Sequence, residues 1–181
     1  NTRFTAGAIR FAYDGPEDLK ALIPDLTQDE LSNTDFGSYT EEQFFDDMGR
    51  ITEYRTDPDL CEQLVTKSKS TLMWMQKKGI RFVPIYGRQA FKVDGKFKFW
   101  GGLTIEAWGG GPGLLEAWQK IADNLEIQIK YSTRAMQLLC DDEGVYGVRV
   151  KESGKTKDLK TRAVILASGG FQANAEWRAR Y

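Results

Sequence analysis

The sequence predicts a mixed α/β chain of the α+β type, with a mainly helical first part, an antiparallel meander and a C-terminal buried strand. Apolar residues recur at helical spacing between residues 40 and 79, which predicts amphipathic helices there. Short segments between residues 127 and 151 alternate apolar and polar residues, as strands with one buried face do. The continuous apolar run at residues 163–167 is typical of a strand buried on both faces.

The first predicted helices begin at recognisable capping residues. The turn signal Asp14-Gly15-Pro16 precedes a short helix over residues 17–22, and residues 24–39 are predicted to be irregular. Thr40-Glu41-Glu42-Gln43 forms a capping box before a second helix. Its apolar face consists of Phe44, Phe45, Met48 and Ile51.

A longer helix is predicted between Asp57, a capping residue before a proline, and Gly79, a left-handed stop. Its apolar stripe consists of Leu60, Leu64, Val65, Leu72 and Met75. A short strand over residues 80–83 follows, and Asp94-Gly95 marks a hairpin turn. The glycine cluster at residues 109–113 then leads into a helix that extends to Leu125.

Three alternating segments and one buried strand complete the predicted elements. The alternating segments are residues 127–131, 134–140 and 145–151. An acidic turn at residues 141–144 separates the last two, and Ser153-Gly154 turns the chain again. The buried strand ends abruptly at Ser168-Gly169-Gly170.

Composition excludes several classes of partner. The 181 residues suffice for one medium domain, and the net charge of -1 gives no reason to expect nucleic acid as a partner. No apolar run approaches the roughly 20 residues that span a bilayer, so we expect no direct membrane insertion. The start of the chain has no apolar signal-peptide core, which favours a cytoplasmic location. It also lacks an initiator Met, as an internal piece of a longer protein would.

Several kinds of catalytic site are excluded by residue type. The chain has no histidine, which removes a Ser-His-Asp triad, the usual zinc ligand sets and any histidyl link to flavin. Cys61 and Cys140 lie in apolar patterns and are interpreted as ordinary buried thiols. The acidic pairs Asp46-Asp47 and Asp141-Asp142 are adjacent in sequence, so their side chains point apart and are interpreted as solvated surface. We predict no metal site.

Two glycine-rich segments and the N-terminus could contact a ligand. Glycines after the buried strand would let a ligand approach the backbone at the carboxyl end of the sheet, although a tight turn is an equally open interpretation. The cluster at residues 109–113 could bind an anion at a helix N-terminus, form a flexible loop, or serve close helix packing. The start of the chain could lie flat against a planar ligand, or be an ordinary loop.

The aromatic residues between positions 91 and 108 have two interpretations. They could form a stacking surface for sugar or nucleic acid. Alternation within a hairpin favours the other interpretation, in which the rings pack on the core and the lysines are solvated. The residues concerned are Phe91, Phe97, Phe99, Trp100 and Trp108.

Four segments in order resemble the flavoprotein family of fumarate reductases, succinate dehydrogenase flavoprotein subunits and ketosteroid dehydrogenases, with the tricarballylate dehydrogenase branch as the most similar. They are NTRFTAGAI at the start, LMWMQKKGIRF, GGGPGLLEAW, and AVILASGGFQANAEWRARY at the end. The last is similar to the family's Ala-Thr-Gly-Gly-Phe signature. Two departures are Ser168, where Thr is commoner, and Ala8, where many relatives have Gly.

The resemblance implies a partial FAD domain and FAD as the cofactor. The implied FAD contacts near the flavin and ribityl chain are Asn1, Thr2, Thr5, Ala6 and Gly7; those near the adenine end are Arg134 and Ala135; those beside the nucleotide are Ala167, Ser168 and Gly169. By the same comparison, the loop that holds the FAD pyrophosphate would precede Asn1, and the substrate-clamping domain would follow Tyr181. No catalytic residue is therefore assigned.

Three regions are implied: a flavin-contacting segment at 1–13, a helical insertion with an aromatic hairpin at 14–108, and part of the FAD-binding domain at 109–181. The implied reaction is hydride transfer between flavin and a carbon–carbon bond beside a carboxylate or carbonyl. The implied partners are the remainder of the polypeptide, a small carboxylate or carbonyl substrate and a separate electron carrier.

We expect the chain alone to be inactive and to hold FAD weakly. The alternative is a stand-alone interaction or regulatory module without catalysis.

Overall fold

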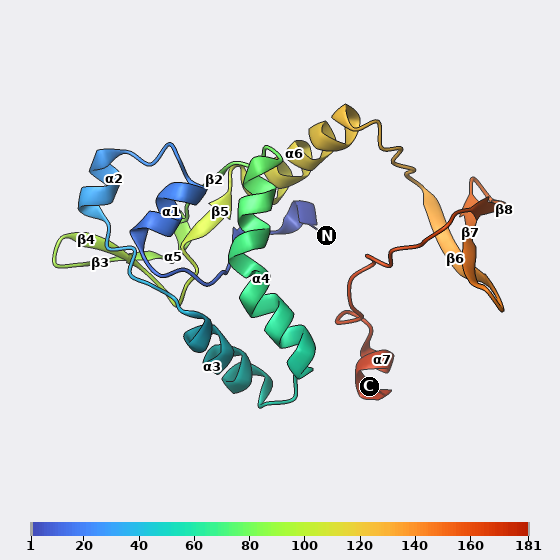
Figure 1. Cartoon of the computed structure of the whole chain (residues 1–181), viewed down its shortest axis with the longest axis horizontal. Helices are drawn as coiled ribbons and strands as arrows, with labels where there is room; N and C mark the ends of the chain where they lie inside the picture. Colours follow the sequence, from blue (N-terminus) through green and yellow to red (C-terminus); the bar gives the residue numbers. More distant parts are fainter. Residues whose placement is uncertain (1, 181) are drawn as a thin grey trace. The chain divides into compact units, whose positions relative to one another are not determined.

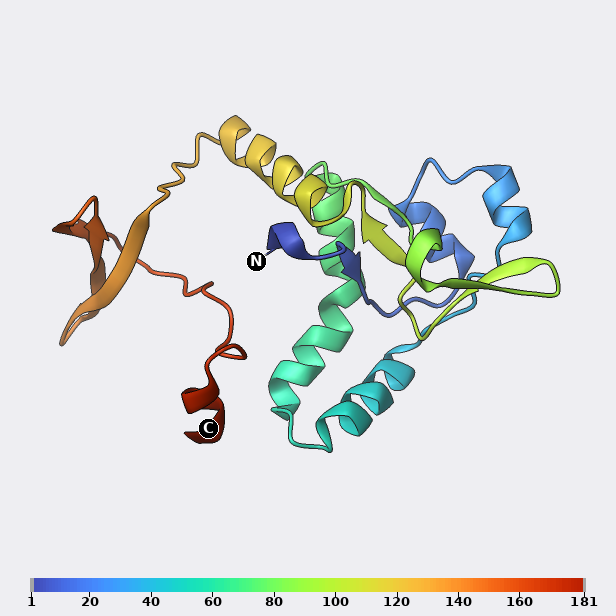
Figure 2. The ribbon, with the colours of Figure 1, turned by 180° about the vertical axis from the view of Figure 1, so that it is seen from behind.

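A computed structural model describes residues 2–180, which form two compact units, Asn1–Ile127 and Gln128–Tyr181. Figures 1 and 2 show the chain from opposite sides, and each unit is described by itself. The helices of the first unit are a 3₁₀ turn η1 (Thr2–Phe4), α1 (Pro16–Leu22), α2 (Gln28–Asn33), α3 (Glu41–Thr52), α4 (Pro58–Lys77), α5 (Tyr86–Gln89) and α6 (Gly110–Asn124). Its strands are β1 (Ala8–Ile9), β2 (Phe82–Pro84), β3 (Ala90–Val93), β4 (Lys96–Phe99) and β5 (Ile105–Ala107).

Side-chain capping starts α3 and α4 as predicted. The Thr40 hydroxyl accepts from the Gln43 N–H, and the Gln43 side chain accepts from the Thr40 N–H, which completes the predicted capping box of α3. Asp57 accepts from the Leu60 N–H and caps α4 ahead of its proline. Gly79 follows α4 with φ 105°, which confirms the predicted left-handed stop.

Helix α2 was not predicted, because residues 24–39 were expected to be irregular. A second capping box starts this helix, with Thr27 and Glu30 each satisfying the other's backbone N–H. The signal was present in the sequence as Thr followed three residues later by Glu. Its six residues carry no buried side chain, so no apolar periodicity marked it.

The first unit contains a three-stranded antiparallel sheet in the order β1-β5-β2. The neighbouring hairpin of β3 and β4 turns at Asp94 and Gly95, whose positive φ values of 49° and 83° are those of a type I′ turn. The hairpin was predicted from this dipeptide. Strand β5 was not predicted, since three residues are too few to show alternation.

One hydrophobic core joins α1, α4 and the three-stranded sheet. Its largest fully buried side chains include Phe11, Leu19, Phe82 and Ile105. Only part of each predicted helical stripe reaches this core: Phe44, Val65 and Leu72 are buried, whereas Ile51 and Leu60 remain exposed. Periodicity finds the apolar side of a helix, but the neighbouring elements decide how much of that side is covered.

The second unit contains the predicted meander. Its strands are β6 (Thr133–Asp141), β7 (Gly144–Glu152) and β8 (Lys155–Lys160), in the order β6-β7-β8, and a short helix α7 (Ala175–Arg180) follows. The turn between β7 and β8 lies at Ser153 and Gly154, with φ values of 49° and 80°. Helices, antiparallel sheets and the meander confirm the predicted α/β class.

Two predicted strands are wrong. Residues 127–131 and 163–167 have no regular secondary structure, and Ile165 is 91% exposed. A strand requires a hydrogen-bonding neighbour, and no described residue pairs with either segment. The prediction for Cys140 is also wrong: Cys61 is buried, but Cys140 is exposed on β6.

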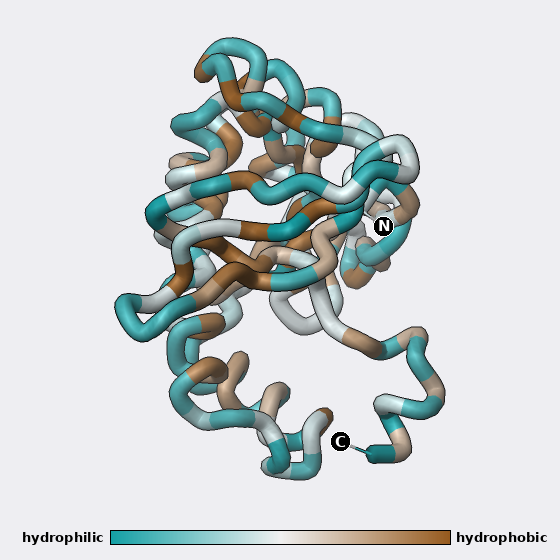
Figure 3. The backbone as a smooth tube through the Cα atoms, turned by 90° about the vertical axis from the view of Figure 1, so that its right-hand side faces the viewer, coloured by the Kyte–Doolittle hydropathy of each residue, from teal (hydrophilic) through white to brown (hydrophobic). Residues whose placement is uncertain are grey.

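Hydrophobic and hydrophilic residues follow one another along the chain, without a long continuous hydrophobic stretch (Figure 3). Among the described residues, no helix is long and apolar enough to cross a membrane.

Candidate functional site

The N-terminal segment, residues 2–7, is held by backbone hydrogen bonds on both sides. The Thr5 hydroxyl donates to the Thr2 carbonyl at 2.9 Å and accepts from the Gly7 N–H at 3.3 Å. The Gly111 N–H donates to the Thr5 carbonyl at 3.1 Å, and the Ala107 N–H donates to the Gly7 carbonyl at 2.8 Å. The bonds from Gly111 and Ala107 attach the segment to the first turn of α6 and to β5.

The glycine cluster allows this backbone to pack directly against α6. A Cβ added at Gly111 would lie 2.2 Å from the Thr2 carbonyl oxygen, and one at Gly7 would lie 2.8 Å from the backbone of Gly110. A Cβ at Gly113 would lie 2.0 Å from the Trp108 carbonyl oxygen. Because real Cβ contacts are never this short, only glycine permits the close approach.

The same contacts use the N–H groups that an anion would need. The Gly111 N–H is bonded to Thr5, Pro112 has no N–H, and the Gly113 N–H donates to Gly109 within the helix. Close helix packing, one of the interpretations of the glycine cluster, is therefore confirmed. Two N–H groups of the first turn of α6 are therefore engaged within the protein.

The exposed side of the N-terminal segment suits a flat ligand. Thr2 and Thr5 are exposed, Ala6 is half-buried and Gly7 is buried. Asn1 lies outside the described residues. Between Thr5 and Ala8 the segment carries no bulky side chain, because Ala6 and Gly7 occupy these positions.

The other predicted FAD contacts belong to the second unit. Arg134 and Ala135 are adjacent exposed residues of β6, paired with Lys151 and Val150 of β7. Ala167, Ser168 and Gly169 are exposed in the irregular segment before α7, where Gly169 has φ 76°. The predicted sheet edge would place these glycines at the end of a strand. In this segment, no described strand precedes them.

One face of the β1-β5-β2 sheet carries a carboxyl group that the sequence did not single out. The register places Ala8, Glu106 and Val83 side by side and half-buried, opposite the face that carries Ile105 and Ala107. Burial raises the pKa of Glu106, and the nearby positive charge of Arg88 lowers it by less. A carboxyl group directly beside the N-terminal segment can exchange a proton or accept a hydrogen bond.

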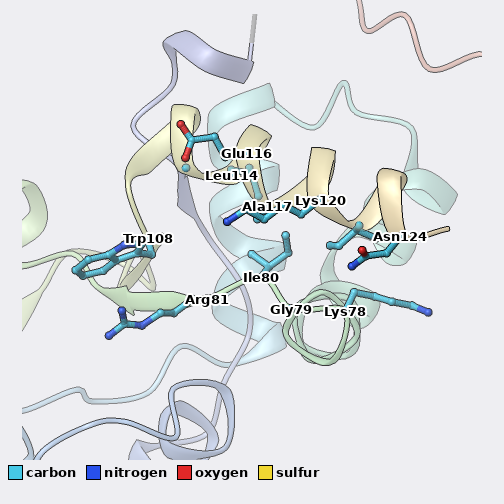
Figure 4. A pocket seen from close by; sticks show the side chains of 12 residues that line it. Lys78, Gly79, Ile80, Arg81, Trp108, Leu114, Glu116, Ala117, Lys120 and Asn124 are labelled. Atoms are coloured by element: carbon cyan, nitrogen blue, oxygen red, sulfur yellow. The ribbon is translucent and has the colours of Figure 1, made fainter. Parts of the chain in front are cut away.

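A cleft of about 420 Å³ lies beneath α6, between this helix and the end of α4 (Figure 4). Its apolar side consists of Ile80, Leu114, Ala117 and Ile121. The charged or aromatic groups along its rim are Lys78, Arg81, Trp108, Glu116 and Lys120.

Arg81 is fixed at one end of this cleft. Its guanidinium donates two hydrogen bonds to one oxygen of Asp25, at 3.1 and 2.7 Å, and lies over the Trp108 ring at 4.3 Å from the centroid. The sequence did not indicate this group, because Asp25, Arg81 and Trp108 are far apart in the chain.

The aromatic hairpin mainly supports packing. Phe99 stacks on Phe36 at 5.8 Å between ring centroids, and Phe97 packs on Tyr86 at 5.2 Å. The Lys92 amine lies 4.8 Å from the centre of the Phe97 ring. Within the described residues, Phe97 and Phe99 therefore follow the interpretation in which the hairpin rings pack inward.

Two titratable groups outside these features, Asp47 and Tyr13, have shifted pKa values. Asp47 accepts from Arg10, Arg50 and Tyr39, and Arg50 with Tyr39 holds its pKa below the usual range. Burial raises the pKa of Tyr13 to about 12, and its hydroxyl donates to the Phe36 carbonyl. No group of acids, cysteines or histidines among residues 2–180 is arranged to hold a metal ion.

The chain is similar to reductases over most of its length. It is 30% identical over 178 residues to a fumarate reductase (cytochrome) of Shewanella frigidimarina, covering 97% of this chain and 28% of that protein. It is 29% identical over 150 residues to a urocanate reductase of Eggerthella lenta, covering 77% of this chain and 23% of that protein. The chain thus spans about a quarter of the length of these relatives.

A solved structure shares the fold. The 3-ketosteroid-delta4-(5alpha)-dehydrogenase of Rhodococcus jostii RHA1, in complex with 4-androstene-3,17-dione, superposes with a TM-score of 0.69 at 19% identity, over 99% of this chain and 40% of that one. The FAD binding domain family matches residues 29–181, which is most of the chain. The chain therefore belongs to the FAD binding domain family, whose cofactor is FAD.

Proposed function

We propose that this chain serves an FAD-dependent oxidoreductase that reduces or oxidises a carbon–carbon bond next to a carboxylate or carbonyl. The observation that carries the proposal is the family match over residues 29–181. Two relatives are named for fumarate and urocanate, both unsaturated carboxylic acids. Tricarballylate-like acids and ketosteroids belong to the same proposal as further substrates.

The proposed role of this chain is to position the cofactor. FAD, when bound, supplies the hydride-transfer chemistry. The attachment of residues 2–7 to β5 and α6 supports a role of Thr2, Thr5, Ala6 and Gly7 beside the flavin. Arg134 and Ala135, and the stretch from Ala167 to Gly169, are proposed to contact the nucleotide part, on the resemblance alone. The proposed regions are a flavin-contacting segment at residues 1–13, a helical insertion at 14–108 and part of the FAD-binding domain at 109–181.

The proposed partners are those of a flavin reductase. They comprise a small carboxylate or carbonyl substrate, a separate electron carrier and the rest of the polypeptide. A cytoplasmic location belongs to the same proposal.

Cofactor retention tests the proposal directly. The full-length protein is purified and passed through gel filtration, and its flavin absorbance is compared with that of the Gly111→Ala and Gly87→Ala variants. We expect flavin in the wild type and in Gly87→Ala, whose Cβ meets no atom within 4 Å. In Gly111→Ala, the new Cβ displaces the N-terminal segment, so the flavin content should fall at least severalfold. A full-length protein that carries no flavin would support the interaction-module alternative.

Reaction class is tested separately. The flavin is reduced chemically without oxygen, and its reoxidation is followed with fumarate, urocanate and a 3-ketosteroid in turn. We expect at least one unsaturated carboxylate or ketone to reoxidise the flavin. Two results together would contradict the proposed reaction class. They are that none of these compounds reoxidises the reduced flavin, and that tricarballylate does not reduce the oxidised flavin.

A further inference from the structure

We propose that the cleft beneath α6 binds an amphipathic carboxylate, that is, an anion with an apolar body. The inference goes beyond the proposed oxidoreductase activity, because none of the described residues predicted to contact FAD lines this cleft. The cleft combines an apolar surface with unequally distributed charges.

The apolar side of the cleft gives the body of such a ligand a surface to cover. Ile80, at the base of the cleft, is 2% exposed and belongs to the core. Leu114, Ala117 and Ile121 of α6 continue this floor. A volume of about 420 Å³ lies within the range of small-molecule sites, which are mostly apolar with few polar groups.

The charges at the rim favour an anion. Figure 4 shows the side chain of Lys120 running along α6 toward the Trp108 end of the cleft, whereas Lys78 points away from it. Within residues 2–180 no ion pair involves Lys120, so its ammonium group is available to a ligand. Glu116 also lines the cleft, but its carboxylate points away from Ile80, so Lys120 is the cation that runs along the cleft.

Arg81 holds a guanidinium at one end of the cleft, where it is paired with Asp25. Its hydrogen bonds to Asp25 and its position over Trp108 fix the guanidinium before any ligand arrives. Because Asp25 already balances much of this charge, Lys120 rather than Arg81 supplies the main attraction for a carboxylate. Trp108, which is 57% exposed, covers the apolar body at the same end and reports on binding by fluorescence.

The test is a titration of the full-length protein with sodium decanoate, followed by calorimetry and by tryptophan fluorescence. Sodium acetate offers the carboxylate without the apolar body, and 1-decanol offers the body without the charge. We expect one saturable decanoate site per chain, with acetate and decanol each bound at least tenfold more weakly. In Trp108→Phe the fluorescence change should be lost while the calorimetric signal remains.

Two lysine variants locate the site. Lys120→Gln should weaken decanoate binding roughly tenfold, since a hydrogen bond to a charged group contributes about that factor. Lys67→Gln removes an exposed lysine of α4 that does not line the cleft and should change nothing. Both positions are exposed, so neither variant endangers folding, and thermal melts confirm this.

Three results would overturn the proposal. They are the absence of saturable decanoate binding, equal binding of decanol, and equal affinities in Lys120→Gln and Lys67→Gln. The titration is informative with or without FAD in the protein, so its failure is distinguishable from failure of the proposed oxidoreductase function.

Discussion

The two units of the chain bury their apolar residues to very different extents. In the first unit, side chains from α1, α4 and the β1-β5-β2 sheet enclose a shared core that contains Phe11, Leu19 and Val65. In the second unit, Leu139 and Val150 are the buried hydrophobic side chains among the described residues, and Ile165 and Leu166 are largely exposed. Both units have well-formed secondary structure, so pairing of strands alone does not produce a core.

The difference comes from the number of layers. A helix or a sheet buries its apolar side only against a second layer, and the first unit supplies helices on its sheet. The meander of β6, β7 and β8 is a single antiparallel layer, for which a covering layer is needed before its apolar side chains are buried. Both units therefore contain regular secondary structure, but most of the buried apolar side chains lie in the first unit.

The largest expected effect compares two leucines of similar burial. Leu72 on α4 is 2% exposed and Leu139 on β6 is 6% exposed. We expect Leu72→Ala to lower the free energy of unfolding of its unit by about 3 kcal/mol, as for a cavity in a closed core. Leu139→Ala should cost about 1 kcal/mol, because the single layer has fewer neighbours to lose. Hydrogen exchange of the α4 and β7 amides measures the two units separately, and equal losses would refute the layer explanation.

A smaller effect is expected where backbone meets backbone. Gly111→Ala places a Cβ 2.2 Å from the Thr2 carbonyl oxygen, so the free energy of unfolding of the first unit should fall by about 2 kcal/mol. Gly87→Ala is the matched control, with no atom within 4 Å and no positive φ. Denaturant titration compares the two variants. If both have the wild-type midpoint, η1 is not packed against α6 in solution.

The acid dependence of stability should differ between the units. Hydrogen bonds from Arg50 and Tyr39 lower the pKa of Asp47 in the folded state, so Asp47 adds stability above its unfolded-state pKa. That contribution disappears as the pH falls below about 4, toward the lowered folded-state value. Asp47→Asn should therefore be less stable than wild type at pH 7, and the difference should shrink on acidification.

Asp158 provides the corresponding group in the second unit, where Arg149 lowers its pKa through hydrogen bonds at 2.7 and 2.8 Å. This pair is exposed on the meander, so Asp158→Asn should change stability at pH 7 less than Asp47→Asn does. Thermal melts from pH 7 to pH 3 measure both variants. A difference between Asp47→Asn and wild type that is constant across this range would contradict the assignment to ionisation.

The smallest expected effect concerns the two type I′ turns. Ser153 has φ 49° and precedes Gly154, in the position where Asp94 precedes Gly95 in the other unit. Ser153→Asn should raise stability by a few tenths of a kcal/mol, because Asn tolerates the left-handed region better than Ser. Asp94→Asn is the control, and since Asp is already favoured there it should change less. Melting temperatures of both variants show which of the two turns gains more stability.

Local chemistry determined much of this protein from the sequence by itself. Thr40, Asp57 and Gly79 begin and end helices through hydrogen bonds and φ preferences that depend only on near neighbours. Asp94-Gly95 and Ser153-Gly154 determine hairpins for the same reason. The ordered family-like segments likewise indicated FAD, since a motif is carried by residues close together in the chain.

Only the tertiary structure decided the features that join distant residues. The segment 163–167 has the composition of a buried strand, but no described neighbour pairs with it, and pairing is a property of two segments. The choice between phosphate binding and packing at Gly111 depended on the position of Thr2 and Thr5 more than a hundred residues earlier. The stack of Arg81 on Trp108, and the placement of Glu106 beside Ala8, likewise exist only because strand register brings those residues together.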